Sequence, residues 1–195
     1  MAMTKLEKRF VNRQRKAEPN IARVRDRLND LEGGSIQNVL ELGCGMGAVS
    51  AFLAGEYNMN AMGTDFDPEQ IEIARSLYPE TELLHYQVED ASSLTFSTNS
   101  FDLVISQNVF HHIPGWKKAV QEVARVLRSQ GHFIWLDLAL PGLIKKVLEP
   151  IVKSYGLYTV GEVQSEFLKH GFTQLYYGRI SHGPFMHHHM VLQKL

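Results

Sequence analysis

A glycine-rich stretch near residue 45 is the first feature of the sequence that points to ligand chemistry. Three glycines alternate with other residues in Gly43-Cys44-Gly45-Met46-Gly47, directly after the short apolar run Asn38 to Leu42. Glycine lets the backbone approach a ligand without interference from a Cβ atom, and a helix start presents unpaired backbone N–H groups. The stretch therefore predicts a ligand-binding loop between a strand and a helical segment that begins at Ala48.

Acidic residues decide which ligand such a loop accepts. Glu41 precedes the loop, and its negative charge disfavours a nearby pyrophosphate but accepts hydrogen bonds from an ammonium group. The glycines alone leave a second interpretation open, because Gly43, Gly45 and Ala48 also fit the G-x-G-x-x-G/A fingerprint of dinucleotide-binding proteins. Asp65 then stands close to the distance of the ribose-binding acid in that fingerprint. An NAD-dependent oxidoreductase is therefore an alternative at this point.

The segment Ser106 to Ile113 supplies the candidate for acid–base chemistry. It follows an apolar run and contains the pair His111-His112. A histidine can remove the proton from a hydroxyl or a protonated amine that is about to act as a nucleophile. We predict His111 as the catalytic residue, with a structural role for both histidines as the alternative.

A second histidine group, His187-His188-His189, invites a metal interpretation. Alternate residues of a strand share a face, so His187 and His189 are expected on one side. No nearby acidic residue or cysteine supports metal binding. We therefore expect packed, hydrogen-bonded histidines and predict no metal site.

The elements that position these residues alternate along the chain. Short apolar runs predict parallel strands, and residues of helical spacing separate them. The alternation favours a doubly wound α/β fold in which ligands bind at the carboxyl ends of the strands. The expected strands are Asn38–Leu42, Asn60–Thr64, Glu82–Val88, Phe101–Ser106 and His132–Leu138, and the expected helices begin at Ala48, Asp67 (as N-cap) and Trp116.

The chain changes character after Pro141. Leu143–Tyr155 and Val160–His170 are expected to be helical, and Phe172–Ile180 and Phe185–Lys194 form a C-terminal antiparallel hairpin. The whole is a seven-stranded, mostly parallel sheet with an added N-terminal helical segment. We expect a single domain over residues 1–195, with an arm or lid at 1–35, a cofactor-binding core at 36–140 and C-terminal helices and hairpin at 141–195.

Composition excludes several functional classes. The chain has 195 residues, 44% of them hydrophobic and 21% charged, with a net charge of -1, which fits a globular protein and not a disordered one. Cys44 is the only cysteine, so an intramolecular disulfide is impossible and a reducing, cytoplasmic location is expected. No signal peptide or membrane span is predicted. The basic residues before position 30 leave RNA binding open, but solvated helix charges explain them better.

Several motifs in the same order resemble those of the class I S-adenosylmethionine-dependent methyltransferases. Val39 to Gly47 resembles the first motif, in which an acidic residue precedes G-x-G-x-G. Gly63-Thr64-Asp65-Phe66-Asp67-Pro68 resembles the second and Val88-Glu89-Asp90-Ala91 the third. Phe101–Ser106 and Val126–Phe133 resemble the fourth and fifth conserved segments. The family's usual strand order further implies that the last strand lies beside the fifth.

The resemblance implies a role for each matching residue. Glu41 would accept from the ammonium group of the cofactor, Asp65 from the ribose hydroxyls and Asp90, in preference to Glu89, from the adenine amino group. Phe66 would contact the adenine, and a backbone N–H near Ala91 would bind a ring nitrogen. Asp102 is interpreted as structural. The remaining cofactor-binding residues are expected to be Gly43, Cys44, Gly45, Gly47 and Gln107.

The sequence thus predicts a methyltransferase that uses S-adenosylmethionine and releases S-adenosylhomocysteine. Asn-Pro-Pro-Tyr and Asp-Pro-Pro-Tyr motifs are missing, so a small-molecule acceptor is favoured over nucleic acid. A non-catalytic adenosylmethionine-binding regulator or partner subunit is the main alternative. Neither the acceptor nor an oligomeric state is indicated.

Overall fold

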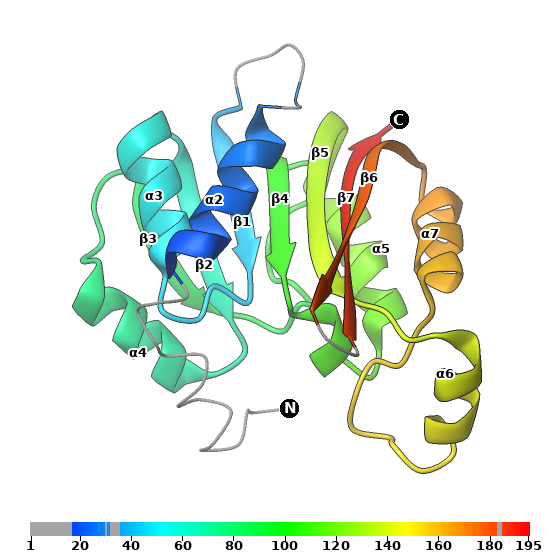
Figure 1. Cartoon of the computed structure of the whole chain (residues 1–195). Coiled ribbons are helices and arrows are strands. Elements are labelled where there is room, and N and C mark those ends of the chain that lie inside the picture. The colour runs from blue at the N-terminus through cyan, green and yellow to red at the C-terminus, as the bar shows by residue number, and fades with distance from the viewer. Residues whose placement is uncertain (1–16, 30, 32–35, 183–184) are drawn as a thin grey trace.

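The computed structural model describes residues 17–29, 31, 36–182 and 185–195. Its centre is a seven-stranded sheet of order β3-β2-β1-β4-β5-β7-β6, as predicted for an α/β fold with the last strand beside the fifth (Figure 1). The first five strands run parallel, and β7 runs antiparallel to both β5 and β6. The strands are β1 (Asn38–Leu42), β2 (Asn60–Asp65), β3 (Leu84–Val88), β4 (Phe101–Gln107), β5 (Leu127–Leu138), β6 (Phe172–His182) and β7 (Phe185–Lys194).

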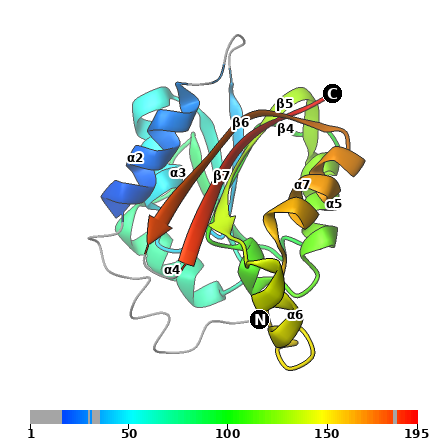
Figure 2. The ribbon, with the colours of Figure 1, turned by 45° about the vertical axis from the view of Figure 1, so that its right-hand side comes forward.

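Helices cover both faces of the sheet, which explains why the central strands are apolar on both sides. In Figure 2, α2 and α3 lie on one side of the sheet and α5 and α7 on the other. The first layer is α2 (Ala17–Leu28), α3 (Ala48–Tyr57) and α4 (Pro68–Leu77), whose buried residues share one core cluster with Val39 and Leu103. The second is α5 (Trp116–Val126) and α7 (Val160–Lys169), packed around Phe133 and Trp135.

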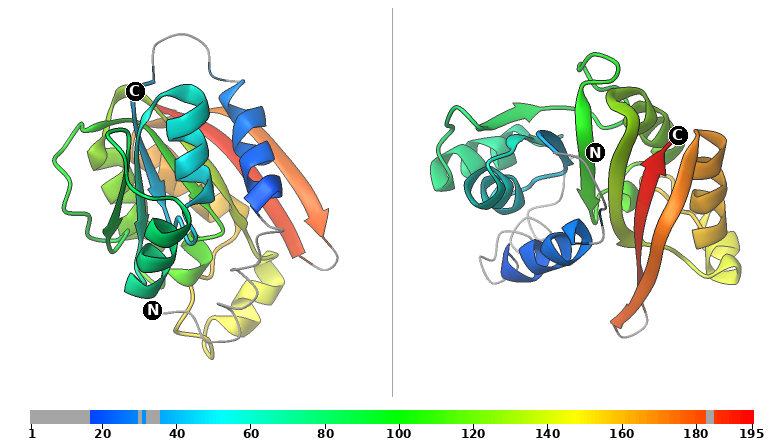
Figure 3. Two further views of the ribbon diagram at one scale, coloured as in Figure 1. Left: turned by 90° about the vertical axis from the view of Figure 1, so that its left-hand side faces the viewer. Right: turned by 90° about the horizontal axis from the view of Figure 1, so that it is seen from above.

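The N-terminal arm falls mostly outside the described residues. Within the described part of it, α2 packs beside α3 on the same face of the sheet, as the two views in Figure 3 show. Val24 is fully buried there. Arg25 lies over the Phe52 ring at 4.9 Å and Arg27 over the Tyr176 ring at 4.0 Å. These contacts hold α2 against both α3 and β6.

Local sequence signals account for the ends of several elements. Asp67 caps α4 by accepting a hydrogen bond from the Glu69 N–H at 3.0 Å, with Pro68 in the first turn, as predicted. Thr159 and Glu162 form a reciprocal capping box at the start of α7. Asp102 is structural, as expected: it accepts from the backbone N–H groups of Gln37 and Asn38 and pairs with Arg128.

Two predicted boundaries were wrong. The helix expected over Leu143–Tyr155 is α6 (Gly142–Leu148), which ends before Pro150 because a residue that precedes proline is disfavoured in helical conformation. The fifth strand begins at Leu127 rather than His132. Gly131 there tolerates no side chain, since a Cβ atom would lie 2.8 Å from the Arg128 carbonyl oxygen.

The last glycine of the loop after β1 is a packing position. Gly47 has a φ of 79°, and a Cβ atom on it would lie 2.5 Å from the hydroxyl oxygen of the buried Tyr86. That hydroxyl donates a hydrogen bond to the Gly47 carbonyl at 3.2 Å. The loop is thereby anchored to β3.

We predict that Gly47→Ala lowers the free energy of unfolding by about 2 kcal/mol or more, through left-handed backbone strain and overpacking against Tyr86. Chemical denaturation measures this change. Gly55→Ala in α3 is the matched control, because no atom lies within 4 Å of its added Cβ, and it should be neutral or stabilising. Equal stability of the two variants would contradict this account of the loop.

Candidate cofactor site

A cavity of about 680 Å³ opens at the carboxyl ends of the parallel strands. It is the position at which doubly wound folds bind their ligands. Ten of the eleven predicted site residues line it: Glu41, Gly43, Cys44, Gly45, Asp65, Phe66, Asp90, Ala91, Gln107 and His111. Gly47 is not part of the described lining, because it faces Tyr86.

The glycine loop after β1 lines this cavity and is held in place by backbone hydrogen bonds. The Cys44 N–H donates to the Thr64 carbonyl at 2.8 Å, which ties the loop to the end of β2. Gly43 has a φ of 65°, and a Cβ atom there would lie 2.3 Å from the side chain of Val109. The loop therefore passes between β2 and the segment after β4, with room only for glycine at this position.

Glu41 is a buried carboxyl that has no basic partner among the described residues. It is 5% exposed, and its side chain is hydrogen-bonded, among the described residues, to Ser50 alone, with the Ser50 hydroxyl donating at 2.5 Å. Burial, with a further contribution from the charge of Asp65, raises the pKa of Glu41 to about 7 despite the Ser50 hydrogen bonds. A cationic ligand in the cavity would stabilise the ionised form.

Asp65 holds the loop as well as lining the cavity. One carboxylate oxygen accepts from the Gly45 N–H at 3.0 Å and the other from the Asp67 N–H at 2.9 Å. Asp65 therefore also has a structural role, because the end of β2 lies against the loop after β1, whose N–H groups need an acceptor. Burial raises the pKa of Asp65 despite these hydrogen bonds.

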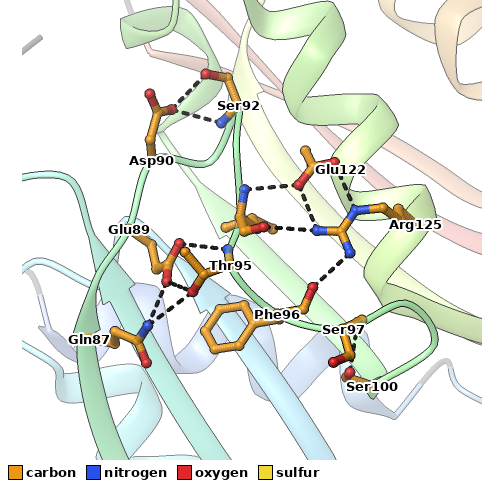
Figure 4. Close-up of polar contacts among 11 residues, drawn as sticks. Gln87, Glu89, Asp90, Ser92, Thr95, Phe96, Ser97, Ser100, Glu122 and Arg125 are labelled. Carbon is orange, nitrogen blue, oxygen red and sulfur yellow. Dashed lines mark hydrogen bonds and ion pairs between the residues drawn. The ribbon is translucent and has the colours of Figure 1, made fainter.

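The two acidic residues after β3 differ in their surroundings. Glu89 is buried, and it accepts from the Thr95 N–H at 3.0 Å and from the Gln87 amide at 2.6 Å. Asp90 is exposed, and one of its oxygens accepts from the Ser92 N–H at 2.8 Å and the Ser92 hydroxyl at 2.7 Å. Figure 4 shows Glu89 turned toward Thr95 and Asp90 toward Ser92. Both carboxylate oxygens of Glu89 therefore accept hydrogen bonds from described residues, whereas only one oxygen of Asp90 does.

Gln107, at the end of β4, joins the cavity to α2. Its amide nitrogen donates to the Asn20 carbonyl at 3.4 Å, while its amide oxygen is buried and has no hydrogen-bond partner among the described residues. An unsatisfied buried acceptor costs free energy. A ligand with a donor group would remove that cost, so the orphan oxygen fits a polar occupant of this cavity.

His111 is fixed by a fully buried acid that the sequence analysis missed. Its Nδ1 atom is hydrogen-bonded to the Asp137 carboxylate. Asp137 also accepts from the backbone N–H groups of Val109 at 2.9 Å, Phe110 at 2.6 Å and Leu138 at 2.7 Å. An acid inside the apolar run Phe133 to Leu140 was the available signal, because buried acids are normally paired.

The C-terminal histidines occupy both faces of β7. His187 lines the cavity, whereas His188 stacks on Tyr177 and is hydrogen-bonded to its hydroxyl at 2.8 Å. Burial, with a further contribution from the charges of Arg23 and Arg27, lowers the pKa of His189 to about 4. Within the described residues there is no group of three or more His, Cys, Asp or Glu side chains that could hold a metal ion.

Comparison with known proteins identifies the family. Residues 40–135 match a model of a methyltransferase domain. The chain is 36% identical over 105 residues to the uncharacterized methyltransferase YcgJ of Bacillus subtilis, covering 53% of this chain and 41% of that protein. It is 34% identical over 99 residues to the 2-methyl-6-phytyl-1,4-hydroquinone methyltransferase of Synechocystis, covering 51% and 31%. The chain belongs to the class I S-adenosylmethionine-dependent methyltransferases.

A solved structure supports the same fold for the methyltransferase chain. The protein PH0226 of Pyrococcus horikoshii has a TM-score of 0.74 and 24% identity, with 95% of this chain and 93% of that one covered. The curated relatives are longer, and the chain spans less than half of their length. No helix within residues 17–29, 31, 36–182 and 185–195 is long and apolar enough to cross a membrane.

The buried carboxyl of Glu41 predicts a pH-dependent stability of the protein. The folded protein keeps this proton up to about pH 7, whereas the ordinary pKa of a glutamate exposed to water, as in the unfolded chain, is 4.5. The folded state therefore binds more protons between these values, and the free energy of unfolding falls as pH rises through this window. The loss amounts to roughly 3 kcal/mol at most.

We expect Glu41→Gln to remove this loss in the ligand-free protein. The variant should be more stable than the natural chain at about pH 8 and nearly equal to it at about pH 5, because the natural carboxyl is neutral there. Denaturant titrations at both pH values measure the difference. Destabilisation of equal size at both values would contradict the assigned burial cost.

Proposed function

We propose that the protein binds S-adenosylmethionine in this cavity and transfers its methyl group to a small-molecule acceptor in the cytoplasm. The observation that carries the proposal is the pair of buried carboxyls, Glu41 and Asp65, on the two sides of the glycine loop. Both have pKa values raised chiefly by burial, and neither has a basic partner among the described residues. Such a site favours a cationic ligand with hydroxyl groups and disfavours a pyrophosphate.

The remaining lining residues fit the other parts of that ligand. Phe66 is 49% exposed beside the cavity, which leaves its ring available for stacking on the adenine. The second oxygen of Asp90 would accept from the adenine amino group, and a backbone N–H near Ala91 would donate to a ring nitrogen. The orphan oxygen of Gln107 would accept from the amino acid part. The backbone of Gly43, Cys44 and Gly45 would lie close to the ligand. Gly47 packs against Tyr86 and so holds the loop in place.

The chemistry needs an aligned acceptor and, for hydroxyl or protonated amine nucleophiles, removal of a proton. When bound, the cofactor supplies a methyl group made electrophilic by its sulfonium. Asp137 holds the Nδ1 proton of His111 and leaves Nε2 as the basic nitrogen of that tautomer. Nε2 takes the acceptor's proton as the methyl group is transferred, and Asp137 stabilises the imidazolium that forms.

Relatives do not identify the acceptor. The name of the Synechocystis relative specifies a hydroquinone, but this chain covers only 31% of that protein. A non-catalytic adenosylmethionine-binding regulator remains the alternative to an enzyme. A screen for transfer of a labelled methyl group into a metabolite extract separates the two, since a regulator binds the cofactor and labels nothing.

Asp65→Asn should weaken binding of S-adenosylhomocysteine by about tenfold or more, because a charged acceptor of the ribose hydroxyls is lost while one backbone hydrogen bond can persist. Calorimetric titration measures the affinity. Glu56→Gln, an exposed position on α3, is the control and should leave it unchanged. Unchanged affinity in a folded Asp65→Asn variant would refute the ribose contact.

His111→Ala should reduce kcat by about 10²-fold or more, the typical contribution of a general base, while the affinity for S-adenosylhomocysteine stays within about twofold. Transfer of the labelled methyl group to the acceptor found in the screen gives kcat. His85→Ala, on the exposed side of β3, is the matched control. A variant at position 111 with normal turnover at every pH would show that His111 is structural.

A further inference from the structure

The charges that line the cavity are segregated along the sheet edge. Every acidic lining residue comes from the segments around β1, β2 and β3, namely Glu41, Asp65, Asp67, Glu89 and Asp90. Other described lining residues come from α2, from the segment after β4, and from β5 and β7, and none of these is acidic. Their ionisable side chains are Arg23, His111, His112 and His187. The cavity therefore has an acidic end and a basic end.

Arg23 differs from its two neighbouring arginines on α2. Arg25 and Arg27 lie over aromatic rings and fix the helix. Arg23 instead lines the cavity, and its one hydrogen bond among the described residues is from Nη1 to the Asn20 side chain at 3.0 Å. It forms no ion pair with a carboxylate of the described chain. Its guanidinium therefore places a positive charge at the cavity with no charged partner among the residues that the structure describes.

Contacts with other elements of the fold fix the position of Arg23. The Asn20 carbonyl accepts from Gln107 at the end of β4, and the Asn20 side chain orients the Arg23 guanidinium. Val24, the next residue, is fully buried under α2. His187 lines the same cavity from β7, in register with Leu138 at the end of β5.

The acid next to this end of the cavity is neutralised by its own contacts. Asp137, a fully buried acid of β5 that is not among the described lining residues, already accepts from three backbone N–H groups and is hydrogen-bonded to His111. Its charge is thus compensated within the fold.

We propose that the methyl acceptor carries an oxyanion, a carboxylate or a phosphate ester, which Arg23 and His187 bind at the basic end of the cavity. This inference rests on the proposed function, because the cationic methyl donor occupies the acidic end. An anion anchored between α2 and β7 places the rest of the acceptor toward His111. Arg23 then determines acceptor specificity and does not bind the carboxylate of the donor's own amino acid part, which lies toward Gln107 in the proposed site.

The test is equilibrium binding to the protein saturated with S-adenosylhomocysteine, so that the acidic end is filled. The probes are 3-hydroxybenzoate, phenyl phosphate and the neutral 3-hydroxybenzamide. We expect the anions to bind at least about tenfold more tightly than the amide. Tighter binding of phenyl phosphate assigns a phosphate ester, and tighter binding of the benzoate assigns a carboxylate.

Two variants with the same change in charge localise the effect. Arg23→Gln should weaken binding of the anions by about tenfold and leave binding of the amide and of S-adenosylhomocysteine unchanged. Lys118→Gln, which removes a positive charge at an exposed position of α5 outside the cavity lining, should change none of these affinities. The inference would be overturned by an amide that binds as well as the anions, by anions that do not bind, or by equal losses in both variants. Weaker binding of S-adenosylhomocysteine to Arg23→Gln would also overturn it, because Arg23 would then bind the donor's carboxylate. Failure of the natural protein to bind S-adenosylhomocysteine would instead refute the proposed function on which it rests.

Discussion

The burial of the Glu41 carboxyl is the constraint around which the cofactor site is arranged. A carboxyl removed from water, with Ser50 as its only hydrogen-bond partner in the part of the chain that the structure describes, is costly when ionised. The protein tolerates it at the junction of β1 and the glycine loop, where a ligand of opposite charge can offset the cost. The fold thus keeps a locally unfavourable group in place for binding, which is typical of functional sites.

The strand order of the sheet gives the cavity an acidic end and a basic end. Because β1 lies between β2 and β4, the acids after β1, β2 and β3 gather on one side. The insertion of β7 beside β5 brings His187 to the other side, next to the segment that follows β4. His111, held by Asp137 across the β4–β5 pair, stands at this second end. The strand order therefore separates the acidic end, where we propose that the donor binds, from the end that we assign to the acceptor.

Sequence reasoning predicted most of the residues that line the acidic end because their signals are local. The alternation of strands and helices, the loop after β1 and the Asp67-Pro68 cap each lie within a few consecutive residues. The acceptor end depends on contacts between distant segments. Asp137 meets His111 across 26 positions, and Asn20 meets Gln107 across 87. No local pattern encodes such pairs, so the roles of Asp137 and Arg23 emerged only from the fold.

The pH dependence of cofactor affinity tests the central role of Glu41 most directly. Below pH 7 the carboxyl must lose its proton to pair with the ammonium group of S-adenosylmethionine, so this affinity should rise by up to about tenfold per pH unit and level off near pH 7. The thioether 5′-methylthioadenosine lacks the ammonium group and should bind with no such dependence. The same pH profile for both ligands would contradict the account.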